Sequence, residues 1–244
     1  MSVLNIAHRG DPANAPESTL AAFRAAVRIG VDMIEFDVQV TADRHLVVIH
    51  DPTVDRTTNG RGAVAGMTLD ALRKLDAGAG FDGYYAGQRI PTLAETLEAI
   101  PAPLLLNVHI KPEWEDEWLA REVLGLLGQH GALARTLVVH HSLPDLDRFR
   151  ALDQRLDYCL LPPSDDSFQY VAAAQAAGLR TLQPGRAMMS RAFCNAVHEA
   201  GMRANVFYAD TERDMHRYIA YGVDGILTDD PGLLAEVLAE PPPR

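Results

Sequence analysis

The strongest constraint on the fold is a regular alternation of strand-like and helix-like segments along the chain. Short apolar runs begin near residues 4, 32, 104, 136, 157, 179, 203 and 223, and an amphipathic segment follows each of them. Strands that alternate with helices pair in parallel. Eight such units within 244 residues predict an α/β fold of the (β/α)8 TIM-barrel type, in which helices surround a closed sheet.

One segment breaks the alternation. After a short β run at 46–49, residues 51–91 are rich in glycine and hold one short helical pattern near 69–75. A stretch this long is not a plain loop, so we expect a small insertion after strand 2 within a single domain spanning 1–244. A doubly wound open sheet is the alternative, but the first strand–helix turn lacks G-x-G-x-x-G.

Charge and apolar patterning restrict the partners. The net charge of −11 argues against a non-specific binder of nucleic acid. Apolar runs fall far short of the roughly 20 residues of a membrane span, so we expect no stable membrane insertion. The opening residues resemble no signal peptide, and the two cysteines, Cys159 and Cys194, are expected to be reduced thiols of a cytoplasmic protein.

Two strands carry paired polar residues at their ends. Glu35 and Asp37 lie two residues apart on one predicted strand, and His109 and Lys111 do so on the next barrel strand. Residues two apart share a strand face, and barrel chemistry occurs at the carboxyl ends of strands. If both pairs face inward, three side chains that can bind a metal ion meet one ammonium group.

A carboxylate pair on a strand usually faces solvent. Here apolar residues flank Glu35 and Asp37 on both strand faces, so the strand is expected to be buried. Two buried unpaired carboxylates cost several kcal/mol, and a divalent cation removes that cost. Individually, His109 could fill space and the His50-Asp51 pair could be a turn, but those alternatives do not explain why all these residues fall at strand ends.

The same strand ends supply groups suited to phosphoryl chemistry. His8 and Arg9 follow the first strand, and His50 follows the β run at 46–49. A metal ion and Arg9 can neutralise phosphate oxygens. One histidine can accept a proton from the nucleophile while the other donates a proton to the leaving oxygen.

With these residues in view, the chain resembles the glycerophosphodiester phosphodiesterase family over essentially its whole length. The most specific blocks are HRG at 8–10 with PEST at 16–19, EFDVQVT at 35–41 and HDPTVDRTTNGRG at 50–62. Weaker blocks are IPTLAETL at 90–97, NVHIKP at 107–112 and GVDGILTDDP at 222–231. The family fold is a barrel with a small insertion after strand 2, as the alternation also predicts.

The resemblance implies a role for each matching residue. His8 and His50 correspond to the acid–base pair, Arg9 to a phosphate ligand, and Glu17 to a glutamate near the site. The metal ligands of the family correspond to three further positions: Glu35, Asp37 and His109. Lys111 keeps the lysine of the E-x-K motif, and Phe207 keeps an aromatic wall of the substrate site.

Two positions depart from the family pattern. His109 replaces the glutamate of E-x-K, so the expected Mg²⁺ or Ca²⁺ could give way to Mn²⁺, Co²⁺ or Zn²⁺, which imidazole favours. It is either the third ligand or a space-filling neighbour of a two-carboxylate site. The second departure is Phe207-Tyr208-Ala209-Asp210 in place of W-T-V-N, which removes an indole donor.

Three functions follow from these observations. The leading hypothesis is a metal-dependent hydrolase of lipid and glycerol metabolism that converts glycerophosphodiesters, a class of small molecules, to glycerol 3-phosphate and an alcohol. The second is a degenerate barrel that binds a phosphorylated ligand without turnover. The third is a phospholipase D-like enzyme acting on lysolipids, ranked lowest because residues 51–91 show few apolar residues expected to be exposed. The head group, nucleophile and oligomeric state stay open at this point.

Overall fold

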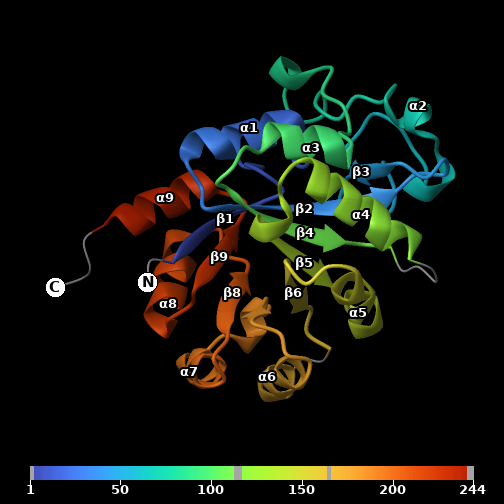
Figure 1. Cartoon of the computed structure of the whole chain (residues 1–244). Coiled ribbons are helices and arrows are strands. Elements are labelled where there is room, and N and C mark those ends of the chain that lie inside the picture. The colour runs from blue at the N-terminus through green and yellow to red at the C-terminus, as the bar shows by residue number, and fades with distance from the viewer. Residues whose placement is uncertain (1–2, 113–116, 164–165, 241–244) are drawn as a thin grey trace.

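The computed structural model describes residues 3–112, 117–163 and 166–240 and confirms the predicted barrel. Eight parallel strands form one hydrogen-bonded order, β6-β5-β4-β2-β1-β9-β8-β7, which curls into a nearly closed barrel (Figure 1). These strands are β1 (Leu4–His8), β2 (Met33–Val40), β4 (Leu105–Ile110), β5 (Thr136–His140), β6 (Asp157–Leu160), β7 (Thr181–Leu182), β8 (Arg203–Phe207) and β9 (Gly225–Thr228).

Helices connect the strands and cover the outside of the barrel (Figure 1). They are α1 (Leu20–Ile29), α3 (Leu93–Ala99), α4 (Trp118–Gln129), α5 (Leu143–Leu152), α6 (Ser167–Ala176), α7 (Arg191–Glu199), α8 (Glu212–Tyr221) and α9 (Pro231–Ala239). Outward-facing strand residues such as Ile34, Phe36 and Val108 are fully buried beneath them. Of the described helices, none combines the length and apolar character that crossing a membrane requires.

The barrel has one seam, which we define as the boundary between β6 and β7, the two ends of the strand order. Side chains bridge it. The hydroxyl of Tyr170 donates to the carbonyl of Leu160 at 2.5 Å and accepts from the backbone N–H of Gln183 at 3.0 Å. At the amino end of the seam, Thr181 Oγ1 donates to Asp157 Oδ2 at 3.1 Å. The seam is therefore closed by side chains that link β6 to β7.

The segment after β2 builds a small substructure beside the barrel. Strand β3 (Leu46–Val48) pairs antiparallel with β2. The chain then forms the short helices η1 (Val64–Gly66), α2 (Leu69–Leu72) and η2 (Gly83–Tyr85). A second cluster of buried apolar residues, Val47, Ile49, Val54, Val64, Leu72, Ala77 and Ile90, holds this segment together. It therefore packs on a core of its own.

Two local expectations from the sequence were wrong. Residues 51–91 do expose large apolar side chains, because Phe81 and Tyr84 are 46% and 86% exposed. This removes the ground on which the lysolipid hypothesis was ranked lowest. The sequence also predicts Ser18 as the cap of the first helix, because serine is a favoured cap residue. The cap of α1 is instead Thr19, whose side chain accepts from Ala22 N, and Ser18 takes a positive φ of 56°.

Other features of the connections agree with the sequence. Four short 3-10 turns accompany the helices in the described ranges; besides η1 and η2 they are η3 (Leu133–Arg135) and η4 (Arg186–Met188). The amphipathic pattern of the sequence predicts a long helix over 113–130. The corresponding helix α4 begins at Trp118 in the structure, and residues 113–116 lie outside the described ranges. Both cysteines are free and buried, as expected.

Candidate active site

A cavity of about 290 Å³ opens at the carboxyl end of the barrel strands. Most of the site residues expected from the sequence line it, namely His8, Arg9, Glu35, Asp37, His50, His109, Lys111 and Phe207. Glu17 reaches the same region through an ion pair with Arg9. The strand ends therefore bring together residues that lie up to 199 positions apart in the sequence.

Parallel register explains why these side chains meet. His8 of β1 pairs with Glu35 of β2, and Asp37 pairs with His109 of β4. Both carboxylates lie inside the barrel, where Glu35 is 3% and Asp37 is 1% exposed. The inward orientation that the two-residue spacing allowed is thus the one observed.

Asp37 contacts two nitrogen-bearing side chains, one on β4 and one just after it. Its Oδ1 lies 3.2 Å from Nδ1 of His109 and 3.0 Å from Nζ of Lys111. Burial alone would raise the pKa of Asp37, but the His109 hydrogen bond and the Lys111 charge overcome it and lower that pKa. Burial also lowers the pKa of His109, so its ring is neutral and keeps a lone pair.

The set of Glu35, Asp37 and His109 has the composition of a metal site. One ligand atom from each of the three side chains lies within 4.8 Å of the other two. Oδ2 of Asp37 is buried and has no hydrogen-bond partner, although Arg9 Nε lies 3.5 Å away as an ion pair. A buried carboxylate oxygen without a donor is a position that a cation would satisfy.

Glu35 lies deeper than Asp37 and interacts with the first strand. Burial and the neighbouring charge of Asp37 raise the pKa of Glu35 to about 7. Its Oε2 accepts the backbone N–H of Arg9 at 3.2 Å and lies 3.9 Å from Nε2 of His8. Close carboxylates with pKa values driven apart are common in functional sites.

His8 is held in one orientation from the far end of the chain. Its Nδ1 lies 2.6 Å from Oδ1 of Asp229, which directly follows β9. Burial lowers the pKa of His8, but the Asp229 hydrogen bond and the charge of Glu35 outweigh that effect and raise the pKa. Phe207 packs edge-on against the ring at 5.1 Å and Tyr208 stacks at 6.1 Å. The Nε2 atom is the ring nitrogen that faces Glu35, at 3.9 Å from its Oε2.

His50 has a similar arrangement with a different electrostatic result. Its Nδ1 lies 2.7 Å from Oδ1 of the adjacent Asp51. Burial lowers the pKa of His50 more than the charges of Asp37 and Asp51 raise it. The two histidines thus share a carboxylate-oriented geometry while their pKa values shift in opposite directions.

Arg9 adopts a backbone conformation that few residues other than glycine take. Its φ is 57°, and the following Gly10 has a φ of 95°. A Cβ atom on Gly10 would lie 2.7 Å from Ala22 in α1, so only glycine fits this turn. The turn directs the Arg9 side chain back over the cavity, where NH1 donates to Glu17 Oε1 at 2.9 Å.

Two polar partners of the site were not expected from the sequence. Asp229 orients His8, and Arg56 forms ion pairs with both Glu17 and Asp51, at 2.6 Å and 2.8 Å. The HDPTVDRTTNGRG and GVDGILTDDP blocks contain these residues, so the signal was present. Nothing in either block indicates which distant side chain each residue contacts.

Comparison with protein families agrees with this geometry. The model of the glycerophosphoryl diester phosphodiesterase family matches residues 8–233. A glycerophosphodiester phosphodiesterase of Caldanaerobacter subterraneus is 38% identical, and the match covers 98% of each chain. A glycerophosphodiester phosphodiesterase of Bacillus subtilis is 29% identical over 96% of this chain and 86% of its own.

Solved structures give the same picture. A phosphodiesterase of Oleispira antarctica, in complex with the product sn-glycerol-3-phosphate, is 26% identical with a TM-score of 0.87 and 96% coverage of both chains. A glycerophosphodiester phosphodiesterase of Agrobacterium tumefaciens is 28% identical with a TM-score of 0.80, and the match covers 97% of this chain and all of that one. The barrel fold thus has solved counterparts.

Proposed function

The chain belongs to the glycerophosphoryl diester phosphodiesterase family, and from that membership we propose that it hydrolyses glycerophosphodiesters to glycerol 3-phosphate and an alcohol. The observation that carries the proposal is the cavity at the strand ends. Two histidines, each hydrogen-bonded to a carboxylate, meet there with the cationic side chains of Arg9 and Lys111 and with a buried pair of carboxylates. Such a set suits cleavage of a phosphodiester bond, which needs charge neutralisation and two proton transfers.

Positive groups at the cavity would bind the phosphate. Arg9 and Lys111 both line it, with side chains 13% and 21% exposed. Arg9 offers a planar fork of N–H donors for two phosphate oxygens, and Lys111 adds a point charge. Since the protein carries a net charge of −11, these two side chains are the groups that would attract an anionic substrate. Glu17 fixes the direction of the Arg9 guanidinium, and Phe207 would form one wall for the glycerol moiety.

His8 and His50 would transfer the protons. One ring accepts the proton of the attacking hydroxyl, which belongs to water or to the glycerol moiety. The new P–O bond forms as the bond to the leaving oxygen breaks, and the other ring donates a proton to that oxygen. If the glycerol hydroxyl attacks, the first product is a cyclic phosphodiester, and a water molecule then opens it to glycerol 3-phosphate in a second displacement at phosphorus. Asp229 and Asp51 hold the two Nδ1 atoms, so that each Nε2 is the nitrogen free to exchange a proton.

We further propose that Glu35, Asp37 and His109 hold one divalent cation. The unpartnered Oδ2 of Asp37 and the close approach of all three ligand atoms support this assignment. When bound, the cation would neutralise negative charge on the phosphate oxygens. Because one ligand is an imidazole, the set should favour Mn²⁺, Co²⁺ or Zn²⁺ over Ca²⁺.

The test is turnover of glycerophosphocholine with and without a chelator. We expect equimolar glycerol 3-phosphate and choline, loss of activity on chelation, and a fall of kcat by about 10²–10⁴-fold in His8→Ala and in His50→Ala. Lysophosphatidylcholine is the second substrate, because Phe81 and Tyr84 are exposed beside the barrel. Binding of glycerol 3-phosphate without any turnover would contradict the proposal and favour the non-catalytic alternative, whereas cleavage of the lysolipid alone would favour the phospholipase D-like one.

A further inference from the structure

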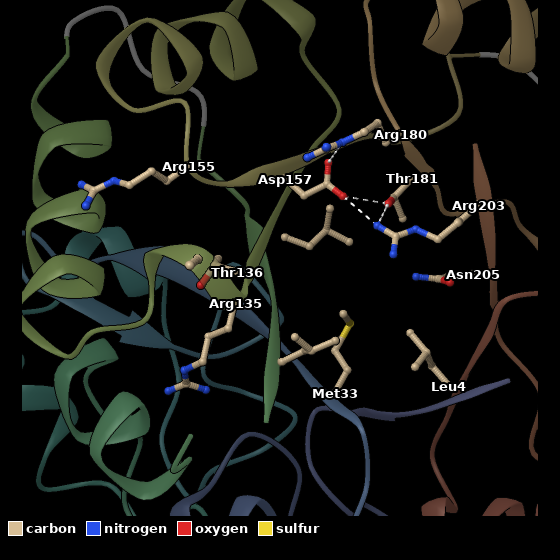
Figure 2. Close-up of a pocket in the computed structure, with 13 residues that line it drawn as sticks. Leu4, Met33, Arg135, Thr136, Arg155, Asp157, Arg180, Thr181, Arg203 and Asn205 are labelled. Carbon is tan, nitrogen blue, oxygen red and sulfur yellow. Dashed lines mark hydrogen bonds and ion pairs between the residues drawn. The ribbon is translucent and has the colours of Figure 1, made fainter. Parts of the chain in front are cut away.

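A second cavity, of about 260 Å³, lies at the amino end of the barrel. The first residues of several strands line it, including Leu4, Met33, Leu105, Thr136, Asp157, Thr181 and Arg203 (Figure 2). The strands run from this cavity to the catalytic one. Asp37 lies four positions after Met33 along β2, which corresponds to about 13 Å at roughly 3.3 Å per residue.

The inner part of this cavity is apolar and its edge is cationic. Leu4, Met33 and Leu105 belong to one apolar cluster inside the barrel. Figure 2 shows Arg203 extending from β8 toward the open centre and Arg180 along one edge, while the guanidinium groups of Arg135 and Arg155 point away from the centre. An apolar interior beside a polar edge is the usual composition of a small-molecule site.

Asn205 is a buried polar side chain aimed into this space. It is only 3% exposed, and its Oδ1 atom is buried without a hydrogen-bond partner among the described residues. Its Oδ1 lies close to Gly225, since a Cβ atom added to that glycine would be only 2.7 Å from the oxygen. The NH₂ group is therefore directed the other way, toward the cavity, as Figure 2 shows. An amide NH₂ group that faces a cavity can donate a hydrogen bond to a ligand there, and the described residues offer it no other acceptor.

The charge balance indicates which anion fits. One carboxylate, Asp157, pairs with both arginines, at 3.5 Å from Arg180 and 3.1 Å from Arg203. Two guanidinium groups and one carboxylate leave an excess of one positive charge. The contacts to Asp157 and Thr181 use a single terminal nitrogen of Arg203, so that its other N–H groups are available to a ligand.

We propose that this amino-end pocket, defined by Leu4, Met33, Leu105, Arg180, Arg203 and Asn205, binds a small monoanionic carboxylate with an apolar body. One carboxylate oxygen accepts from the Arg203 guanidinium and the other accepts from the NH₂ group of Asn205. The apolar body covers the three apolar side chains. A dianionic phosphate ester fits less well, because its second charge would approach Asp157.

The probe is benzoate, and the reporter is the methyl group of Met33. In protein labelled with ¹³C at the methionine methyl groups, Met33→Leu identifies the Met33 signal among the seven methionines. We expect benzoate to shift that signal in a saturable way with a Kd on the order of 1 mM. Neutral benzyl alcohol and dianionic phenyl phosphate should shift it less.

Variants then assign the binding groups. Arg203→Gln should raise the benzoate Kd by about tenfold or more, because a charge-assisted hydrogen bond is lost. Asn205→Asp should abolish binding, because it places a like charge beside the ligand. Arg121→Gln is the matched control, since Arg121 is also an exposed arginine in an ion pair, on α4, and it should leave the Kd unchanged. If Asn205→Asp does not fold, the comparison of Arg203→Gln with Arg121→Gln still decides.

Several outcomes would overturn the proposal. They are an absent or non-saturable shift, an equal Kd in Arg203→Gln, and stronger binding of phenyl phosphate or benzyl alcohol than of benzoate. Saturating glycerol 3-phosphate separates the two cavities, because it should occupy the catalytic one and leave benzoate binding unchanged. Displacement of benzoate by glycerol 3-phosphate would place the ligand in the catalytic cavity and refute the assignment.

Discussion

The replacement His109→Glu tests the proposed metal site most directly. It would create a site of three carboxylates, whereas the wild-type site has two carboxylates and one imidazole. In the metal-free protein the new carboxylate would lie within about 4.8 Å of Glu35 and Asp37. At an effective dielectric constant of about 20, two unit charges 4.8 Å apart repel by about 3.5 kcal/mol.

Lys111, at 3.0 Å from Asp37, offsets part of that repulsion, as does Arg9. We therefore expect the metal-free variant to lose on the order of 2 kcal/mol, which corresponds to a fall in Tm of about 4–8 °C for a chain of this size. Added divalent cation should restore more of the Tm than it does in the wild-type protein. Activity after chelation should be restored by Mg²⁺ or Ca²⁺ in the variant and by Mn²⁺, Co²⁺ or Zn²⁺ in the wild type.

The assays are thermal unfolding with and without each cation, and recovery of activity in the same series. His109→Gln is the control, because it has nearly the same shape as the glutamate variant and no charge. A metal-free Tm equal to that of His109→Gln, together with an unchanged order of cations, would refute the reasoning and leave His109 as a space-filling neighbour of a two-carboxylate site.

Three further predictions concern residues around the same cavity. Asp229→Asn removes the charge that orients His8, and kcat should fall by about 10–100-fold with little change in Tm; an unaltered kcat would contradict the positioning role. Arg9→Lys should keep the fold but lower kcat/KM by about tenfold or more, because an ammonium group lacks the planar fork, and a wild-type kcat/KM would exclude this form of phosphate binding. Arg56→Gln should lower the free energy of unfolding by about 1 kcal/mol near neutral pH, a value that allows for the exposure of Arg56. Arg56 lowers the pKa of Asp51, so the stabilisation by this ion pair is present above the ordinary carboxyl pKa and is lost as the pH falls through the lowered pKa of Asp51. In urea unfolding, the difference in free energy of unfolding between wild type and Arg56→Gln should therefore shrink in acid. A difference that stays constant with pH would disprove the coupling.

The part of the site that the sequence could predict is the part that local periodicity determines. The two-residue spacing within β2 and within β4 placed Glu35 and Asp37 on one face and His109 on another strand of the same barrel mouth. Barrel topology then required the strand ends to meet. The convergence of Glu35, Asp37 and His109 follows from those two facts.

Partners across long sequence separations could not be predicted in the same way. The His8–Asp229 contact joins residues 221 positions apart, and the Arg56–Glu17 contact joins residues 39 apart. Each depends on the direction of one side chain leaving a loop, which periodicity does not specify. The exposure of Phe81 and Tyr84 was missed for a related reason. The composition of residues 51–91 shows which residues are apolar, but it does not show whether a second small core covers them.

The seam between β6 and β7 gives the barrel a defined place to loosen first. Elsewhere around the barrel, neighbouring strands share backbone ladders, whereas the seam depends on single side chains such as Tyr170. Its amide protons should exchange with solvent before those of β1, β2 and β4, which carry His8 and the three proposed metal ligands. The barrel can therefore open locally at the seam while the residues on β1, β2 and β4 keep their positions. Substitutions that strengthen the contacts of Tyr170 across the seam can then raise the thermal stability without changing the chemistry.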